Sequence, residues 1–242
     1  MFLCKKIRFF IIAQELLSAI CGQKKTDGLQ YKIITDEFGL ILELYSKEEE
    51  NINKFIFSLP EDLMFFHSSF IDLSISDMAS EKLKENGAKL VVVESCTGGS
   101  ISKIITDKPG SSDYFWGGFI TYNNKAKEEL GVPAFIIEKY GAVSEETVVS
   151  MAEKGLEKSG ADICVSVSGI AGPGGGSVDK PVGTVWIAVK TVKKDIAKTF
   201  MFLFLGSRKE IRDKASQAAL LIISKELLIS EGIDSTIFEY YI

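Results

Sequence analysis

Histidine is almost absent from this chain. Its 242 residues include a single one, His67, in the stretch DLMFFHSSF, which offers no other candidate catalytic residue. A half-buried or surface position is the simplest interpretation of this histidine. Hydrolytic chemistry, if the protein performs it, is therefore expected to use a lysine or a carboxylate as its base instead of an imidazole.

Paired cysteines are missing as well. The four cysteines form no CxxC motif and have no histidine at metal-ligand spacing; they are Cys4, Cys21, Cys96 and Cys164. This pattern argues against a zinc site or a disulfide framework and favours reduced thiols. We therefore expect a cytoplasmic protein without a bound metal.

The sequence also lacks an excess of positive charge and a long apolar run. Its 28 lysines and arginines stand against 33 acidic residues, and the net charge of -5 argues against non-specific nucleic-acid binding. The apolar N-terminal stretch MFLCKKIRFFIIAQELLSAICG is interrupted by Arg8, Gln14 and Glu15 and is too short to span a bilayer. We expect neither a nucleic-acid nor a membrane partner.

The residue pattern changes near residue 75, which predicts two domains. Residues 1–75 contain a hairpin-like pair of β-type runs, YKIITDEFGLILELYS, and neither a glycine-rich loop nor a dense polar cluster. A small α+β domain for support or dimerisation is expected there. Residues 76–242 alternate strands with helices and finish on a long helix, which predicts a layered α/β sandwich.

The sheet of this second domain is expected to be mixed. KLVVVES and DICVSVSG read as strands buried on both faces, whereas the last two strands, TVWIAVKT and IAKTFMFLFL, are close enough to pair as a hairpin. In such folds ligands bind beyond the C-terminal ends of the parallel strands. Two strands end in polar loops, at residues 94–99 and 168–177, and these loops mark the candidate site.

The first loop, ESCTGG, concentrates reactive side chains at a strand-to-helix turn. Its residues are Glu94, Ser95, Cys96, Thr97, Gly98 and Gly99. Backbone amides around residues 97–99 can approach a ligand, and a helix N-terminus favours an anion or a developing oxyanion. The spacing alone fits both a capped helix start and the turn of a nucleophile.

The second loop, GIAGPGGGS at residues 169–177, is rich in glycine but matches neither dinucleotide-binding nor phosphate-loop motifs. Its backbone can line a phosphate, a carboxamide or a flat ring, or it can be a flexible connection. Asp179 and Lys180, which follow it, are typical of a solvated turn.

Lysines and arginines supply the remaining candidate groups. Lys125 and Lys127 lie two positions apart, so on a helix they point to different faces and one of them can face inward. A lysine buried beside polar groups can act as a base near neutral pH. Arg208 and Arg212, spaced i, i+4 on the last helix, fit an anion clamp or a surface of salt bridges. Together these groups suit acyl transfer or amide hydrolysis without histidine or metal.

Five motifs in this order carry a family resemblance: ESCTGG, PGSSDYFWGGFITYNNKAK, GAVSEETV, VSGIAGPGGGSVDKPVGTVWIAV and GSRKEIRDKA. They closely resemble the C-terminal domain of the CinA (competence/damage-inducible) family, whose members include nicotinamide mononucleotide deamidases, also called PncC. The resemblance implies a three-layer α/β/α sandwich with a mostly parallel mixed sheet. It also implies hydrolysis of nicotinamide mononucleotide to nicotinate mononucleotide and ammonia, with no cofactor.

The resemblance also implies roles for individual residues. Ser95 matches the nucleophile and Lys127 its partnering base, with Tyr122 nearby as a third catalytic residue. The positions that match substrate-binding residues are Glu94, Thr97, Gly98, Gly99, Asn124, Ser168, Gly169, Gly172, Gly175 and Arg212. The expected partner is a small mononucleotide substrate, and a homodimer is expected from the base rate for enzymes of this size.

Residues 1–75 look like the KH-like middle domain that precedes the deamidase domain in full-length CinA proteins. The nucleotide-hydrolase-like N-terminal domain of those proteins is not in this sequence, so no pyrophosphatase activity is expected. Two departures, Val93 and Gly174, replace an alanine and an aspartate that are common in the family, and neither affects a predicted site residue.

Three alternatives stay open at the level of sequence. Cys96 can be the nucleophile, with Glu94 and a lysine as its partners. The protein can be a non-catalytic nucleotide-binding accessory protein related to competence or damage. The same scaffold can also act on another carboxamide or on a phosphoester.

Overall fold

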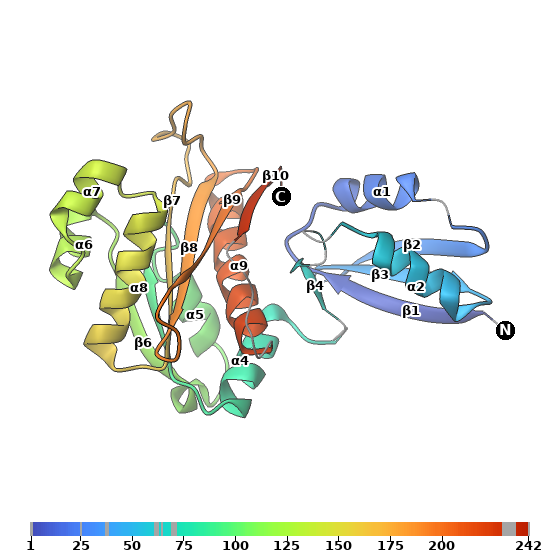
Figure 1. The fold of residues 1–242 in the computed structure, drawn as a ribbon, viewed down its shortest axis with the longest axis horizontal. Coiled ribbons are helices and arrows are strands. Elements are labelled where there is room, and N and C mark those ends of the chain that lie inside the picture. Colours follow the sequence, from blue (N-terminus) through green and yellow to red (C-terminus); the bar gives the residue numbers. More distant parts are fainter. Residues whose placement is uncertain are drawn as a thin grey trace. The chain divides into compact units, whose positions relative to one another are not determined.

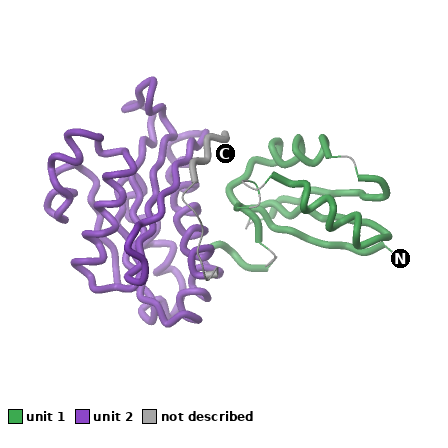
Figure 2. The backbone as a smooth tube through the Cα atoms, in the orientation of Figure 1, with its two compact units in different colours: residues 1–75 green, residues 76–242 purple. Residues whose placement is uncertain are grey.

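The structure, a computed structural model, describes residues 2–24, 26–36, 39–60, 63, 65–68, 72–228 and 236–241, the last range by its backbone only. It divides the chain into two compact units, Met1–Ile75 and Ser76–Ile242, which Figure 2 shows in different colours.

The first unit is built on an antiparallel sheet with strand order β2-β3-β1-β4. Its elements are β1 (Leu3–Phe9), α1 (Gln14–Gln23), β2 (Leu29–Asp36), β3 (Gly39–Ser46), α2 (Glu49–Ser58) and β4 (His67–Ser68). The predicted hairpin is confirmed as β2 and β3, and residues 37–38 between them lie outside the described residues. His67 is half-buried and pairs with Phe9 of β1.

The second unit contains a mixed sheet with strand order β10-β9-β8-β7-β5-β6 (Figure 1). Three of its five strand pairings are parallel, and the two that involve β8 are antiparallel. Its strands are β5 (Leu90–Glu94), β6 (Phe115–Ile120), β7 (Ile163–Gly169), β8 (Thr184–Thr191), β9 (Lys198–Leu203) and β10 (Thr236–Tyr241). Its helices are α4 (Ile75–Glu85), α5 (Ser100–Thr106), η1 (Ser111–Asp113), α6 (Asn124–Leu130), α7 (Ala134–Tyr140), α8 (Glu145–Ser159) and α9 (Arg208–Leu228).

Helices cover both faces of this sheet, which confirms the three-layer α/β/α sandwich. Helix α8 packs on β5, β7 and β8, whereas α5 and α9 lie on the opposite face (Figure 1). Residues 90–93 of β5 are completely buried, as expected for a strand between two helical layers. Gly155 lets α8 approach the sheet closely, because a Cβ atom there would lie 2.6 Å from Val93 Cγ2.

The hairpin of β8 and β9 is confirmed. So is the capping box that begins α9, in which Ser207 N donates to Glu210 Oε2 at 2.7 Å and Glu210 N donates to Ser207 Oγ at 3.4 Å. The expectation that the chain finishes on this helix is wrong, because β10 follows it and pairs in parallel with β9. No helix in the described part of the chain is long and apolar enough to cross a membrane.

Candidate active site

The two polar loops predicted from the sequence come together at the C-terminal ends of β5 and β7, two central strands of the second sheet. Glu94, the last residue of β5, pairs with Ile120 of β6 on one side and Val167 of β7 on the other. Backbone hydrogen bonds continue past the strand end, since Ser95 N donates to Val167 O at 3.0 Å and Thr121 N donates to Glu94 O at 2.7 Å. Ser95 therefore lies between the residues that follow β6 and the end of β7.

A buried lysine contacts the predicted nucleophile. Lys127 Nζ donates to Ser95 Oγ at 3.0 Å and to the carbonyl oxygen of Thr121 at 2.8 Å. The Lys127 side chain is only 1% exposed, whereas Lys125 is exposed. The structure thus selects Lys127 as the inward-facing lysine of the pair.

The start of α6 sets the position of Lys127. Asn123 caps this helix, and its side-chain oxygen accepts from Ala126 N at 2.8 Å. Gly131, with φ of 115°, ends the helix in a left-handed conformation. This single capped segment carries Lys127 from the end of β6 back towards Ser95.

Burial makes the Lys127 amine hold its proton less tightly than an exposed lysine does. Desolvation lowers its pKa from 10.5 to about 8, because the ammonium form loses hydration that two hydrogen bonds replace only in part. At pH 7 about a tenth of the molecules then carry a neutral amine at this position. A neutral amine 3.0 Å from a serine hydroxyl can accept its proton.

Glu94 holds the beginning of α5. Its carboxylate is completely buried; Oε2 accepts from the backbone N–H groups of Gly99 and Ile101 at 2.9 and 3.1 Å. Oε1 accepts from the backbone N–H and the hydroxyl of Ser102 at 2.9 and 2.7 Å. A negative charge at a helix N-terminus is favourable, so Glu94 fixes the helix directly after the turn that carries Ser95.

Hydrogen bonds within the turn engage some of the backbone N–H groups that could bind an oxyanion. Gly99 N donates to Glu94, and Gly98 N donates to the carbonyl oxygen of Ser95 at 3.0 Å. Within the described chain, the N–H groups of Cys96 and Thr97 donate to no other residue. Thr97 is completely buried, so the available amide is that of Cys96, one residue nearer to Ser95 than the predicted group at residues 97–99.

Arg212 holds the same turn from α9. Its Nε donates to Cys96 O at 3.0 Å, and its Nη2 donates to Thr97 O at 2.6 Å and to Ser100 Oγ at 3.4 Å. A Cβ atom on Gly98 would lie 3.4 Å from this Nη2. In this structure Arg212 thus supports the backbone of the turn.

Arg208 connects two other predicted site residues. Its Nη1 donates to Gly172 O at 2.7 Å and its Nη2 donates to the Tyr122 hydroxyl at 2.6 Å. Both Arg208 and Tyr122 are exposed, Tyr122 to 55%. The contacts join α9, the glycine-rich loop and the residues after β6 beside the Ser95 turn.

The remaining predicted positions belong to the end of β7, the loop after it and the first residue of α6. Ser168 is buried, and its hydroxyl donates to Ala142 O at 2.6 Å. Gly169 and Gly172 have no room for a side chain, since a Cβ atom would lie 2.7 Å from Val185 and 2.6 Å from Val182 respectively. Gly175 and Asn124 are exposed.

Two features of the site depend on tertiary contacts that the sequence does not reveal. Lys180 is no solvated turn residue, because its Nζ donates to Tyr140 O at 2.8 Å and Val143 O at 2.7 Å and so ties the glycine-rich loop to the segment before α8. Thr97 is completely buried, and its Oγ1 has no hydrogen-bond partner in the described chain. No local pattern marks either feature.

The environment of Cys96 keeps its thiol protonated. Burial raises the pKa of its thiol to about 12, so the thiol stays protonated at neutral pH. Nucleophilic attack by cysteine requires the thiolate. The environment of the turn therefore favours the serine over the cysteine.

The chain is similar to known proteins over much of its length. A family model, the CinA C-terminal domain, matches residues 72–227. The nicotinamide-nucleotide amidohydrolase PncC of Shigella flexneri is 44% identical over 157 residues, which cover 64% of this chain and 94% of that protein. A CinA-like protein of Desulfotalea psychrophila is 49% identical over 156 residues, which cover 64% of this chain and 37% of that protein.

The chain spans between a third and a half of the length of the CinA-like relatives that it matches. Among solved structures, a CinA superfamily protein from Klebsiella pneumoniae is 30% identical with a TM-score of 0.61, over 64% of this chain and 96% of that one. The competence/damage inducible protein CihA from Agrobacterium tumefaciens is 39% identical with a TM-score of 0.57, over 60% of this chain and 91% of that one.

Proposed function

This chain belongs to the CinA C-terminal domain family, and from that premise we propose that it is an amidohydrolase that converts nicotinamide mononucleotide and water to nicotinate mononucleotide and ammonia. The observation that carries the proposal is the buried contact of 3.0 Å between Lys127 Nζ and Ser95 Oγ. The similarity to the Shigella flexneri protein named nicotinamide-nucleotide amidohydrolase supports the choice of substrate.

The first half of the reaction forms an acyl-enzyme. Neutral Lys127 takes the proton of Ser95 as Oγ attacks the carboxamide carbon, and the carbonyl electrons move onto its oxygen. The N–H group of Cys96 donates to this oxyanion; one such donor typically lowers the barrier by about 3 kcal/mol. The Lys127 ammonium then protonates the leaving nitrogen, the C–N bond breaks, and ammonia departs.

The second half regenerates the serine. Lys127, neutral again, takes a proton from a water molecule that attacks the acyl carbon. Collapse of the second tetrahedral intermediate breaks the bond to Ser95 Oγ, which recovers its proton from Lys127. The products are nicotinate mononucleotide and the free enzyme, so no oxidant, metal or cofactor takes part in these steps.

The phosphate of the substrate is assigned to Arg208. Arg212 already donates to two carbonyl oxygens of the nucleophile turn, whereas Arg208 is exposed and reaches the glycine-rich loop and Tyr122. An anion that approaches this loop can replace Gly172 O and the tyrosine hydroxyl as the acceptor for the guanidinium. We therefore assign phosphate binding to Arg208 and the positioning of the turn to Arg212.

Ammonia release from nicotinamide mononucleotide by the pure protein tests this function. Ser95→Ala is expected to lower kcat by roughly a thousandfold or more, because the nucleophile is removed. Cys96→Ala is the matched control and should stay near the wild-type rate. A Ser95→Ala variant that releases ammonia as fast as the wild type contradicts the mechanism. Tight binding of the nucleotide without ammonia release by the wild type would instead favour a non-catalytic nucleotide-binding protein.

A further inference from the structure

The glycine-rich loop between β7 and β8 projects past the ends of the strands (Figure 1). Residues 173–181 of this loop are all exposed except Lys180. Backbone hydrogen bonds close the two ends of the loop, since Ile170 N donates to Thr184 O and Gly183 N donates to Ile170 O, both at 2.8 Å. The part between these ends depends on side chains to hold its position.

Arg208 holds the first part of the loop. Its Nη1 donates to Gly172 O at 2.7 Å, and its Nη2 donates to the Tyr122 hydroxyl at 2.6 Å. A Cβ atom on Gly98 would lie 3.8 Å from Tyr122 Cε2, so the tyrosine ring lies against the turn that carries Ser95. These contacts join the loop to the proposed active site.

Lys180 holds the second part of the loop. Its Nζ donates to Tyr140 O at 2.8 Å and to Val143 O at 2.7 Å. Its backbone closes a turn with Ser177, because Lys180 N donates to Ser177 Oγ at 3.1 Å and Ser177 N donates to Lys180 O at 2.8 Å. Lys180 therefore attaches this turn to the segment between α7 and α8.

The segment that receives Lys180 is itself fixed. Its four consecutive carbonyl groups, at residues 140–143, all accept hydrogen bonds from side chains. Besides Lys180, the hydroxyls of Ser144 and Thr147 donate to the second of these groups at 3.0 and 2.7 Å, and the hydroxyl of Ser168 donates to the third at 2.6 Å. Because Ser168 lies just before the loop, the segment holds the chain on both sides of the glycines.

We propose that Lys180 is a positioning residue that sets the affinity for the mononucleotide by holding the glycine-rich loop in its binding conformation. The inference rests on the proposed function, in which Arg208 beside this loop binds the phosphate. A loop that is already ordered lowers the entropy cost of binding. Within the described chain Lys180 has no hydrogen bond to Ser95 or Lys127, so the chemical step should not depend on it.

Lys180→Met tests this role, since it keeps an apolar stem and removes the ammonium group. KM for nicotinamide mononucleotide in ammonia release should rise roughly tenfold, while kcat stays within about twofold of the wild-type value. Lys180→Arg keeps a cationic donor and should restore most of the affinity. Hydrogen exchange at the Ser177 amide should be faster in Lys180→Met, because the turn that this amide closes is released.

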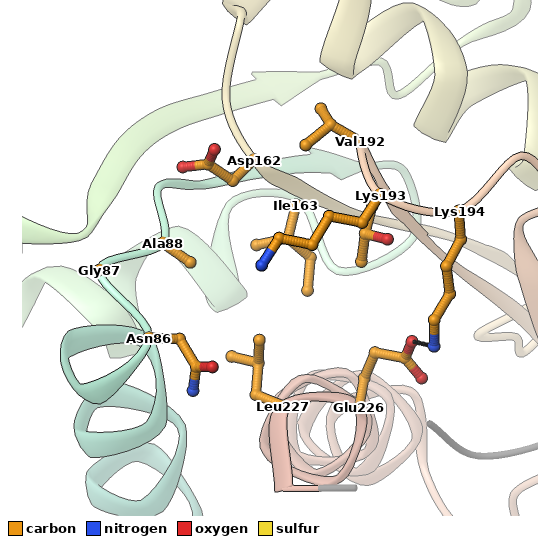
Figure 3. A pocket seen from close by; sticks show the side chains of 11 residues that line it. Asn86, Gly87, Ala88, Asp162, Ile163, Val192, Lys193, Lys194, Glu226 and Leu227 are labelled. Carbon is orange, nitrogen blue, oxygen red and sulfur yellow. Dashed lines mark hydrogen bonds and ion pairs between the residues drawn. The ribbon is translucent and has the colours of Figure 1, made fainter. Parts of the chain in front are cut away.

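Lys193→Met is the matched control. Lys193 is exposed in the turn between β8 and β9 and lines a surface hollow at the other end of β7 (Figure 3). This hollow includes Ile163, the first residue of β7, whereas the glycine-rich loop follows the last. The control variant loses the same ammonium group at a place far from the loop, so its KM and kcat should equal those of the wild type.

Titration calorimetry in the Ser95→Ala background measures nucleotide affinity without turnover, and adding Lys180→Met there should weaken binding by the same roughly tenfold factor. The inference is overturned if Lys180→Met keeps the wild-type KM and affinity, if it lowers kcat instead, or if Lys180→Arg restores nothing. A wild type that binds the nucleotide but releases no ammonia contradicts the proposed amidase alone. Normal ammonia release with an unchanged KM in Lys180→Met contradicts this inference alone.

Discussion

At the scale of single residues, the site depends on the burial of one lysine. An exposed lysine stays protonated far above neutral pH and cannot act as a base, whereas Lys127 is enclosed and its pKa falls to about 8. Its hydrogen bonds to Ser95 and Thr121 direct the amine at the Ser95 hydroxyl. Burial therefore supplies the reactivity, and the hydrogen bonds supply the direction.

This burial predicts a pH profile for the proposed reaction. The active form carries neutral Lys127, so kcat/KM for ammonia release should rise with pH and level off above about pH 8. The rate rises with pH because only the neutral amine can accept the serine proton. The rise is centred near pH 8, and not near 10.5, because burial lowers the pKa of Lys127. Lys127→Met should abolish turnover, and Lys125→Met, which alters an exposed neighbour, should retain both the rate and the profile. A wild-type profile that is flat between pH 6 and 9 would rule out this base.

At the scale of elements, the seven-residue helix α5 is too short to be stable by itself and depends on the groups that hold its first turn. The Glu94 carboxylate accepts four hydrogen bonds there, and Arg212 holds the preceding carbonyl groups from α9. Ser95 lies between these two anchors. The geometry of the nucleophile turn is therefore a property of β5, α5 and α9 together.

Glu94→Gln tests the role of this carboxylate. The four donors around Glu94 bind two carboxylate oxygens, whereas a glutamine side chain has only one oxygen. The NH₂ group of the glutamine would face the N–H and O–H groups that donate to the second oxygen. The free energy of unfolding of the second unit should fall by about 2–3 kcal/mol in a denaturant titration, with a loss of kcat because the turn after β5 loosens. Glu138→Gln, at an exposed position of α7, is the matched control and should leave both quantities unchanged. A Glu94→Gln variant as stable as the wild type would show that the four hydrogen bonds do not hold the turn.

At the scale of the whole molecule, the chain consists of two compact units, and all predicted site residues lie in the second. The family model matches residues 72–227, nearly all of them in the second unit, and the match to PncC of Shigella flexneri covers 94% of that relative. We expect the proposed activity to be a property of the second unit. The KH-like character of residues 1–75 and their role in support or dimerisation remain predictions.

Expression of residues 76–242 alone tests this independence. The fragment should fold, and its kcat and KM for ammonia release should match those of the full chain, because no site residue has been removed. The same fragment with Ser95→Ala provides the background rate. A folded fragment with a much higher KM or a lower kcat would show that the first unit contributes to catalysis.

The sequence alone predicted features that depend on neighbouring residues. The buried strands at 90–94 and 163–169, the hairpin of β8 and β9 and the capping box at Ser207 follow from apolar runs, spacing and local hydrogen bonds, and the structure confirms them. The α/β/α architecture follows from the order of these elements. Family motifs then singled out Ser95 and Lys127 without any coordinates.

Only the tertiary structure decided which groups are buried, which are bonded and which are free. Lys125 and Lys127 have the same chemistry, and their difference arises from the packing of α6. Arg212 reaches Cys96 across 116 positions of the chain, and Lys180 holds carbonyl groups 37 and 40 positions away. Such contacts depend on how distant segments close on one another, and no local pattern encodes that geometry. For the same reason the sequence does not predict strand β10, which pairs with β9.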